Sequence, residues 1–309
     1  MLELLLCAWL PAELPSSLNV PYVIVLGIAQ DAGAPQAGVR DPERWRPQRR
    51  ALPASIAIVD PRCGKRWMIE ATPAFPEQLH RLDEATGPAS TSGSEGRPLD
   101  GLFLTHAHMG HYSGLIHLGR EAMSTRSLPL YVMPRMSAFL RSNGPWSQLV
   151  ELEQVSLRTM KPGVPVELRE DLSVTPLLVP HRDEFSETVG FIVRGPHRGL
   201  AFIPDVDKWS RWGERPPIEA VIRSVDVALL DGTFFAEGEL PHRSMAEIPH
   251  PFITESLKRF GSLDEKERRK IRFIHLNHTN PALDPEGPAA RSVVASGMSI
   301  ARSGDRHRL

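Results

Sequence analysis

Apolar runs that stop close to a histidine or an aspartate are the feature of this sequence that most restricts its fold. Four of them are followed closely by His181, Asp205, Asp231 and His275. Short runs of this kind are typical of strands, and strand ends at one edge of a sheet are rigid supports on which loops build sites. The pattern therefore predicts a sheet protein whose polar site lies along one edge.

The short apolar runs alternate with helical patterns, the layout expected when helices cover a sheet, so we predict the α/β class. Helices are expected over 75–82, 113–123, near 137–142 and over 253–259. Strands are expected at 22–26, 55–59, 66–70, 130–133, 174–179, 190–193, 200–203, 227–230 and 271–274.

Length and composition favour one domain. Of the 309 residues 41% are apolar, enough for one sizeable core, and we place that domain at 20–309. Residues 83–100 are rich in Gly, Ser, Thr, Pro and acidic side chains, so a flexible insertion is expected there.

Residues 1–19 are expected to form an N-terminal extension. Its apolar stretch, 2–10, is too short to span a bilayer and has no Lys or Arg ahead of it, so it lacks the form of a complete signal peptide. A cytoplasmic location is the first expectation. A periplasmic or secreted location is the alternative if this stretch is the remnant of a signal.

The charges are balanced, with 36 Lys and Arg against 37 Asp and Glu. Nothing in this balance indicates a nucleic acid or a membrane surface as partner. The two cysteines, Cys7 and Cys63, exclude a disulfide framework and leave metal binding to His and Asp. We expect a small-molecule or phosphodiester substrate, and a homodimer is compatible with the sequence.

Three histidines lie within six residues, directly after the apolar run 102–104. They are His106, His108 and His111. Side chains at i and i+2 on an extended segment face the same side, and the third follows as the chain turns into a helix, so all three can reach one cation. Since His is the commonest metal ligand, the cluster predicts a metal site at a strand-to-helix corner.

The cluster resembles the H-x-H-x-D-H signature of the metallo-β-lactamase fold, except that Gly110 stands where that family has aspartate. Further segments resemble the branch of the family that contains the PQQ-biosynthesis B proteins, over roughly 20–300. These segments are 28–38, 70–73, 179–181, 203–205, 230–233 and 275–281. The resemblance implies an αββα four-layer sandwich.

The resemblance also implies the roles of single residues. One metal would be held by His106, His108 and His181, with Asp205 bridging to a second metal held by His111 and His275. Imidazoles with one carboxylate suit one or two Zn²⁺ ions, and Fe²⁺ or Mn²⁺ equally. Gly110 removes a carboxylate from the second site, so we expect that site to bind more weakly and Gly110→Asp to strengthen it if the corner accepts a side chain.

Several further polar residues lie in or near the segments that carry these candidate ligands. His275 is favoured over His278 as the last ligand because it directly follows a strand. His250 is expected to act in catalysis together with Asp205, since phosphodiesterase relatives carry a histidine in that loop that assists the leaving group. Asp231 either bonds a ligand histidine or ends a strand. The remaining polar residues of these segments, Asp31, Gln36, Asp60 and Glu70, are assigned no chemistry beyond structure.

Three functions are compatible with the sequence. The leading one is a metal-dependent hydrolase in which metal-activated water attacks a phosphodiester or related electrophile. The second is a PQQ-biosynthesis-like protein that acts oxidatively with iron or carries the cofactor. The third is a non-enzymatic metal-binding relative, which Gly110 keeps open. A β-lactamase is the least favoured.

Overall fold

A computed structural model of the protein describes residues 19–87, 98–213, 216–240 and 244–309. Most of the expected N-terminal extension and the centre of the expected insertion lie outside these residues. Within them, no helix is long and apolar enough to cross a membrane.

Two seven-stranded sheets form the framework. The first has the order β14-β1-β2-β3-β4-β5-β6. Its strands are β1 (Tyr22–Gly27), β2 (Ser55–Asp60), β3 (Lys65–Ile69), β4 (Gly101–Phe103), β5 (Leu128–Val132), β6 (Val155–Thr159) and β14 (Arg306–Arg308). The second has the order β13-β12-β11-β10-β9-β8-β7. Its strands are β7 (Val166–Arg169), β8 (Leu172–Leu178), β9 (Val189–Arg194), β10 (Gly199–Ile203), β11 (Val227–Asp231), β12 (Ile271–Ile274) and β13 (Ser299–Ile300).

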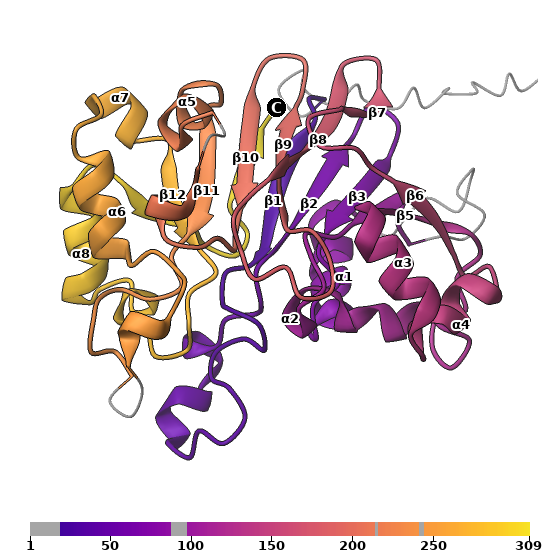
Figure 1. Cartoon of the computed structure of the whole chain (residues 1–309), viewed down its shortest axis with the longest axis horizontal. Helices are drawn as coiled ribbons and strands as arrows, with labels where there is room; N and C mark the ends of the chain where they lie inside the picture. Colours follow the sequence, from indigo (N-terminus) through magenta and orange to yellow (C-terminus); the bar gives the residue numbers. More distant parts are fainter. Residues whose placement is uncertain (1–18, 88–97, 214–215, 241–243) are drawn as a thin grey trace, which may run out of the picture.

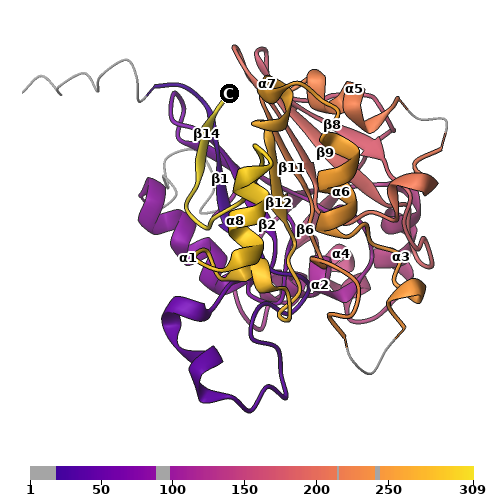
Figure 2. The same ribbon diagram turned by 90° about the vertical axis from the view of Figure 1, so that its left-hand side faces the viewer.

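The sheets lie face to face between two layers of helices (Figure 1). One layer contains α1 (Phe75–Thr86), α2 (Met109–Tyr112), α3 (Pro134–Ser142) and α4 (Trp146–Glu151). The other contains α5 (Ile218–Arg223), α6 (Ile253–Phe260), α7 (Glu265–Arg268) and α8 (Pro288–Ala295). The last strand, β14, pairs antiparallel with the first, β1, and Figure 2 shows the two side by side. The predicted four-layer αββα sandwich is confirmed.

Alternation along the strands explains the layers. In β1, Val23 and Val25 pack between the sheets, whereas Ile24 and Leu26 pack against the helices. β10 does the same with Phe202 on one face, between the sheets, and Ile203 on the other. Strands covered on both faces need apolar residues at every position, which is why these segments read as continuous apolar runs.

Parallel pairing places the polar strand ends together. β4 pairs parallel with β3 and β5, and β10, β11 and β12 pair parallel with one another. Parallel strands end at the same edge, where ligands bind in sheets of this kind. In Figure 1 the loop 28–54 extends below the sheets at the end where α2 lies. The site predicted at one sheet edge therefore has its supports on this side.

The helix expected over 113–123 is wrong in type and bounds. α2 begins at Met109, and 3₁₀ helix η4 (Ser113–Leu118) follows it. Two backbone hydrogen bonds join this segment to the residue Ala71. The N–H of Ala71 donates to the carbonyl of His111, and the N–H of Gly114 donates to the carbonyl of Ala71. These long-range bonds override the local helical pattern.

Other bounds also differ from the prediction. α1 continues through Thr86, so the first residues of the expected insertion are helical. Residues 88–97 of that insertion lie outside the described residues. Several short elements lie outside the predicted ranges, namely β6, β7, β13, β14, α4, α5, α7 and α8. The remaining 3₁₀ helices are η2 (Pro42–Trp45), η3 (Pro47–Arg49), η5 (Trp209–Arg211), η6 (Met245–Glu247) and η7 (Pro281–Leu283).

Candidate metal centre

Three imidazoles converge at the end of β4. Nδ1 of His108 lies 2.8 Å from Nε2 of His106 and 3.2 Å from Nε2 of His181. Nε2 of His106 and of His181 lie 3.4 Å and 3.3 Å from the two carboxylate oxygens of Asp205. We call these four residues the first cluster; one donor atom from each lies within 4.8 Å of the others.

The spacing of the first cluster fits a metal. A tetrahedral Zn²⁺ with bonds of roughly 2.0 Å separates its ligand atoms by about 3.3 Å. The nitrogens of His106, His108 and His181 lie close to this separation. Three ring nitrogens that face one another cannot all be satisfied by protons, whereas their lone pairs can all face one cation.

A second cluster adjoins the first. It contains Asp31, His111 and His275, and one donor atom from each lies within 4.8 Å of the others. Nε2 of His111 and Nε2 of His275 are buried and have no hydrogen-bond partner among the described residues. Buried polar atoms are rarely left unpaired in proteins, so these two nitrogens fit the role of cation ligands.

Asp205 stands between the clusters. Its Oδ2 lies 3.4 Å from Nε2 of His106 and 3.5 Å from Nε2 of His111, and its Oδ1 faces His181. The loop after β10 holds it in this place, where it is only 5% exposed. A carboxylate so placed can contact two cations, one in each cluster.

The ring nitrogens that face away from the clusters have oxygen partners. Nδ1 of His106 lies 2.9 Å from Thr105 Oγ1, and Nδ1 of His275 lies 2.9 Å from Thr233 Oγ1. The other three contacts are His181 Nδ1 to Asp207 at 3.2 Å, His108 Nε2 to Glu184 at 3.0 Å and His111 Nδ1 to Glu70 at 3.4 Å. Such partners hold a histidine in the tautomer and orientation that metal binding needs.

The ionisation of the site also favours a cation. Burial lowers the pKa of His106 and of His275 well below the usual value, so both rings are neutral. Burial opposes ionisation of Asp205, but His181 and His250 hold the pKa of this carboxyl well below its usual value. Against its own burial, His111 has a strongly raised pKa because Glu70 and Asp205 face it. His106, His275 and Asp205 are therefore in the forms that metals bind, whereas a cation at His111 would have to displace the proton of that ring.

His250 lies beside the clusters and is held by Asp231. Its Nδ1 lies 2.8 Å from Asp231 Oδ2 and 3.3 Å from Asp205 Oδ1. Asp231 also accepts bonds from the backbone N–H groups of Val206 and Thr233, so the carboxylate is fixed. Burial disfavours the charged ring, but Asp231 and Asp205 raise the pKa of His250 to about 9.

A cavity of about 450 Å³ opens over the clusters. His108, Asp205 and His250 line it, together with Arg182 and the loop residue Gln30. Arg182, which lies 3.4 Å from Glu184, gives this cavity a guanidinium group beside the carboxylates of Asp31 and Asp205. The cavity can therefore admit a small anionic molecule to the clusters.

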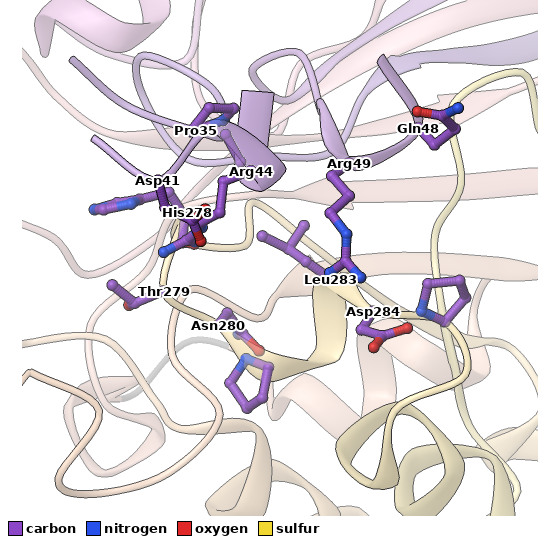
Figure 3. Close-up of a pocket in the computed structure, with 13 residues that line it drawn as sticks. Pro35, Asp41, Arg44, Gln48, Arg49, His278, Thr279, Asn280, Leu283 and Asp284 are labelled. Atoms are coloured by element: carbon purple, nitrogen blue, oxygen red, sulfur yellow. The ribbon is translucent and has the colours of Figure 1, made fainter. Parts of the chain in front are cut away.

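His278 belongs to a different cavity. This cavity, of about 520 Å³, is lined by His278 with Arg44, Arg49 and Asp284, and Figure 3 shows their side chains. Arg44 donates to the backbone carbonyl of His278. His278 is in neither cluster, so of the two candidates for the last ligand only His275 faces them.

Four of the carboxylates that surround the clusters were not predicted to act there. Asp31 and Glu70 have positive φ angles of 42° and 82°. Residues other than glycine rarely adopt this backbone conformation, and no sequence pattern predicted it at these two positions. Asp207 and Glu184 follow ligand candidates by two or three positions, a spacing that could have indicated a partner. The second cluster was expected to have only a share of Asp205 as its carboxylate, and the structure also places Asp31 beside His111 and His275.

Comparisons with known proteins agree with this architecture. A family model described as the beta-lactamase superfamily domain matches residues 65–299. Coenzyme PQQ synthesis protein B of Methylococcus capsulatus is 28% identical over 91% of this chain and 97% of its own length. The Zn²⁺-bound PqqB structure from Methylobacterium extorquens has a TM-score of 0.77 at 23% identity, over 93% of this chain and 100% of that one. A diphosphatase from the PhnP family has a TM-score of 0.62 at 20% identity, over 94% and 97%.

Proposed function

This chain belongs to the beta-lactamase superfamily, and from that premise we propose that it catalyses the metal-dependent hydrolysis of a phosphodiester or a related electrophile. The observation that carries the proposal is the convergence of five histidines on Asp205 where strand ends of both sheets meet. These are His106, His108, His111, His181 and His275. The Zn²⁺ bound by the PqqB of Methylobacterium extorquens supports zinc as the first metal to test.

The residues of the two clusters would hold the metal. His106, His108 and His181 would bind one cation, His111 and His275 a second, with Asp205 between them. A bound divalent metal lowers the pKa of water toward about 7 and polarises the oxygen of the electrophile. The chain itself contributes the ligand geometry, because each histidine is fixed by a partner on its far side.

His250 would supply a proton. Its Nδ1 is directed at Asp231, which leaves Nε2 to carry the proton that a leaving group needs. In the metal-free protein a pKa of about 9 keeps this imidazole protonated near neutral pH. General acid catalysis by a positioned histidine contributes roughly 10²–10⁴-fold to rate.

Arg182 would bind the substrate. It lines the cavity over the clusters, where its guanidinium can pair with a phosphate oxygen. The solved diphosphatase from the PhnP family has the same fold, which supports a phosphorus-centred substrate as the first class to test. The cavity volume of about 450 Å³ suits a small molecule.

A second candidate function rests on the curated relatives. Proteins named Coenzyme PQQ synthesis protein B match over nearly their whole length, at 28% identity for the one from Xanthomonas euvesicatoria. In that case the same clusters would hold iron, which would let the protein act on a precursor of the cofactor with an external oxidant such as dioxygen taking the electrons, or the protein would carry the cofactor. The same residues serve both functions, so metal identity separates them.

The deciding experiment is elemental analysis of protein purified without added metal, together with turnover of bis(p-nitrophenyl) phosphate. Zinc or manganese with turnover supports hydrolysis. Iron as the resident metal without turnover supports the oxidative candidate. Fully metal-loaded protein, tested with zinc and with manganese, that turns over no phosphodiester and no phosphomonoester would exclude the hydrolytic proposal for these substrates.

A further inference from the structure

We infer that Asp31, on the loop after β1, is the carboxylate of the second metal site and takes the place of the side chain missing at Gly110. The inference rests on the proposed metal clusters and adds a ligand to them. Asp31 Oδ1 lies 3.8 Å from Nε2 of His111, and it belongs to the same cluster as His275.

The space at Gly110 carries this assignment. A Cβ atom built on Gly110 would lie 2.3 Å from Asp31 Oδ1 and 2.5 Å from Asp31 Cα. These distances are too short for any side chain at position 110. The loop that carries Asp31 therefore occupies the volume that an aspartate side chain at position 110 would fill. The carboxylate of Asp31 lies where the Cβ atom of that side chain would be.

Long-range backbone bonds hold Asp31 there. The N–H of Gln30 donates to the carbonyl of Leu276 at 2.8 Å, and the N–H of Leu276 donates to the carbonyl of Ile28 at 2.8 Å. The residues next to Asp31 are thus paired with those next to His275. A loop fixed to the strand end that supplies a ligand keeps its carboxylate in register with that ligand.

The charge balance of the site supports the same assignment. Without Asp31, two divalent cations would share the single carboxylate of Asp205. Asp31 adds a second negative charge beside His111 and His275, whose Nε2 atoms have no hydrogen-bond partner among the described residues. An oxygen and two nitrogens, completed by Asp205, give the ligand number that Zn²⁺ prefers.

This geometry reverses the expectation for Gly110→Asp. A new side chain would push the loop and Asp31 away before it could act as a ligand. Gly110 is then a requirement of the Asp31 arrangement, because only glycine permits the close approach of the loop backbone.

The test is titration of the full-length, chelator-treated protein with Mn²⁺, followed by calorimetry and by EPR of the bound metal. Asp31→Asn removes the charge but keeps a residue that tolerates positive φ. Gly110→Ala changes no donor atom but displaces Asp31. In both variants we expect the first binding event unchanged and the second weakened by more than about 100-fold, beyond the 10–100-fold typical of groups that only support a ligand.

Two matched controls accompany these variants. Asp41→Asn makes the same charge change in the same loop, outside the clusters, and Gly144→Ala adds a methyl group where nothing lies within 4 Å. Both should bind metal as the unmodified protein does. Two unchanged binding events in Asp31→Asn would overturn the inference, as would a single event in the unmodified protein that Asp31→Asn leaves unaltered.

The outcomes separate this inference from the proposed function. If binding of the second cation depends on Asp31 but the protein has no hydrolytic activity, Asp31 is a ligand and the proposed hydrolysis is wrong. If the protein hydrolyses phosphodiesters and binds both cations equally well without the Asp31 carboxylate, the proposed function stands and the inference about Asp31 is wrong.

Discussion

The two clusters are similar in chemistry but differ in how the chain builds them. The first takes His106 and His108 from one short motif after β4 and adds His181 and Asp205, which follow strands β8 and β10 of the other sheet. The second joins Asp31 from a loop near the start of the chain, His111 from α2, and His275, which follows β12. Each ligand candidate of the first cluster lies two to five residues after a strand, a pattern visible in the sequence, whereas the place of Asp31 in the second cluster depends on tertiary contacts.

The clusters also differ in what holds their carboxylates. Asp205 is 5% exposed and is surrounded by histidines, so it has no freedom to move away. The side chain of Asp31 is 45% exposed and lies on a loop. We therefore expect the second cluster to lose its cation first when the protein is diluted or treated with a chelator.

The largest expected effect is that of Asp205→Asn, because Asp205 contacts both clusters. The variant should bind less of both metals and lose phosphodiester turnover, whereas His108→Ala should strip the first metal alone. Metal content by mass spectrometry after gel filtration distinguishes the two cases. If Asp205→Asn still held one cation as tightly as the unmodified protein, the two clusters would not share this carboxylate.

The next largest effect is that of His250→Gln, which should change the turnover rate and leave metal binding intact. His250→Gln should reduce turnover by roughly 10²–10⁴-fold, the usual contribution of a general acid, with metal content unchanged. His278→Gln is the matched control, because His278 lines the other cavity, beside Arg44 and Arg49. Equal loss of turnover in both variants would show that His250 is not the general acid.

How far the sequence could predict this site follows from the same contrast. The apolar runs and the polar residues after them predicted the supports of His181, Asp205 and His275, because strand alternation and burial are local properties. The place of Asp31 depends on pairing between Gln30 and Leu276, which no local pattern shows. The 113–123 helix failed for a related reason, since bonds to Ala71 reshape that segment.

A smaller effect compares the partners of the clusters. Glu70 is fully buried and lies 3.4 Å from Nδ1 of His111, whereas Glu184 is 45% exposed and lies 3.0 Å from Nε2 of His108. Glu70→Gln should weaken the second cation by about 10–100-fold, the range for groups that orient a ligand. Glu184→Gln should have less effect on the first cation, because water can replace an exposed partner. Metal titration of both variants checks the order, and a larger effect of Glu184→Gln would contradict it.

The last expected effect concerns stability and not metal binding or turnover: it is the pH dependence that His250 gives to the metal-free protein. Its pKa is raised from the ordinary value of 6.5 to about 9, because Asp231 and Asp205 outweigh the burial of the ring. A pKa raised by folding stabilises the protein fully below the unfolded value, near 6.5, and this stabilisation is lost as the pH rises through about 9. The free energy is at most on the order of 3 kcal/mol.

Thermal melting of chelator-treated protein and of His250→Gln measures this contribution. The difference in melting temperature between them should be largest at pH 6 and should shrink as the pH approaches 9.5. A metal in the first cluster would place positive charge beside Asp205 and so lower the pKa of His250, which moves the transition to lower pH in the loaded protein. Melting curves that stay parallel from pH 6 to 9.5 would show that His250 does not titrate in this window. The ring would then be held neutral, and the proton at Nε2 would have to come from another group.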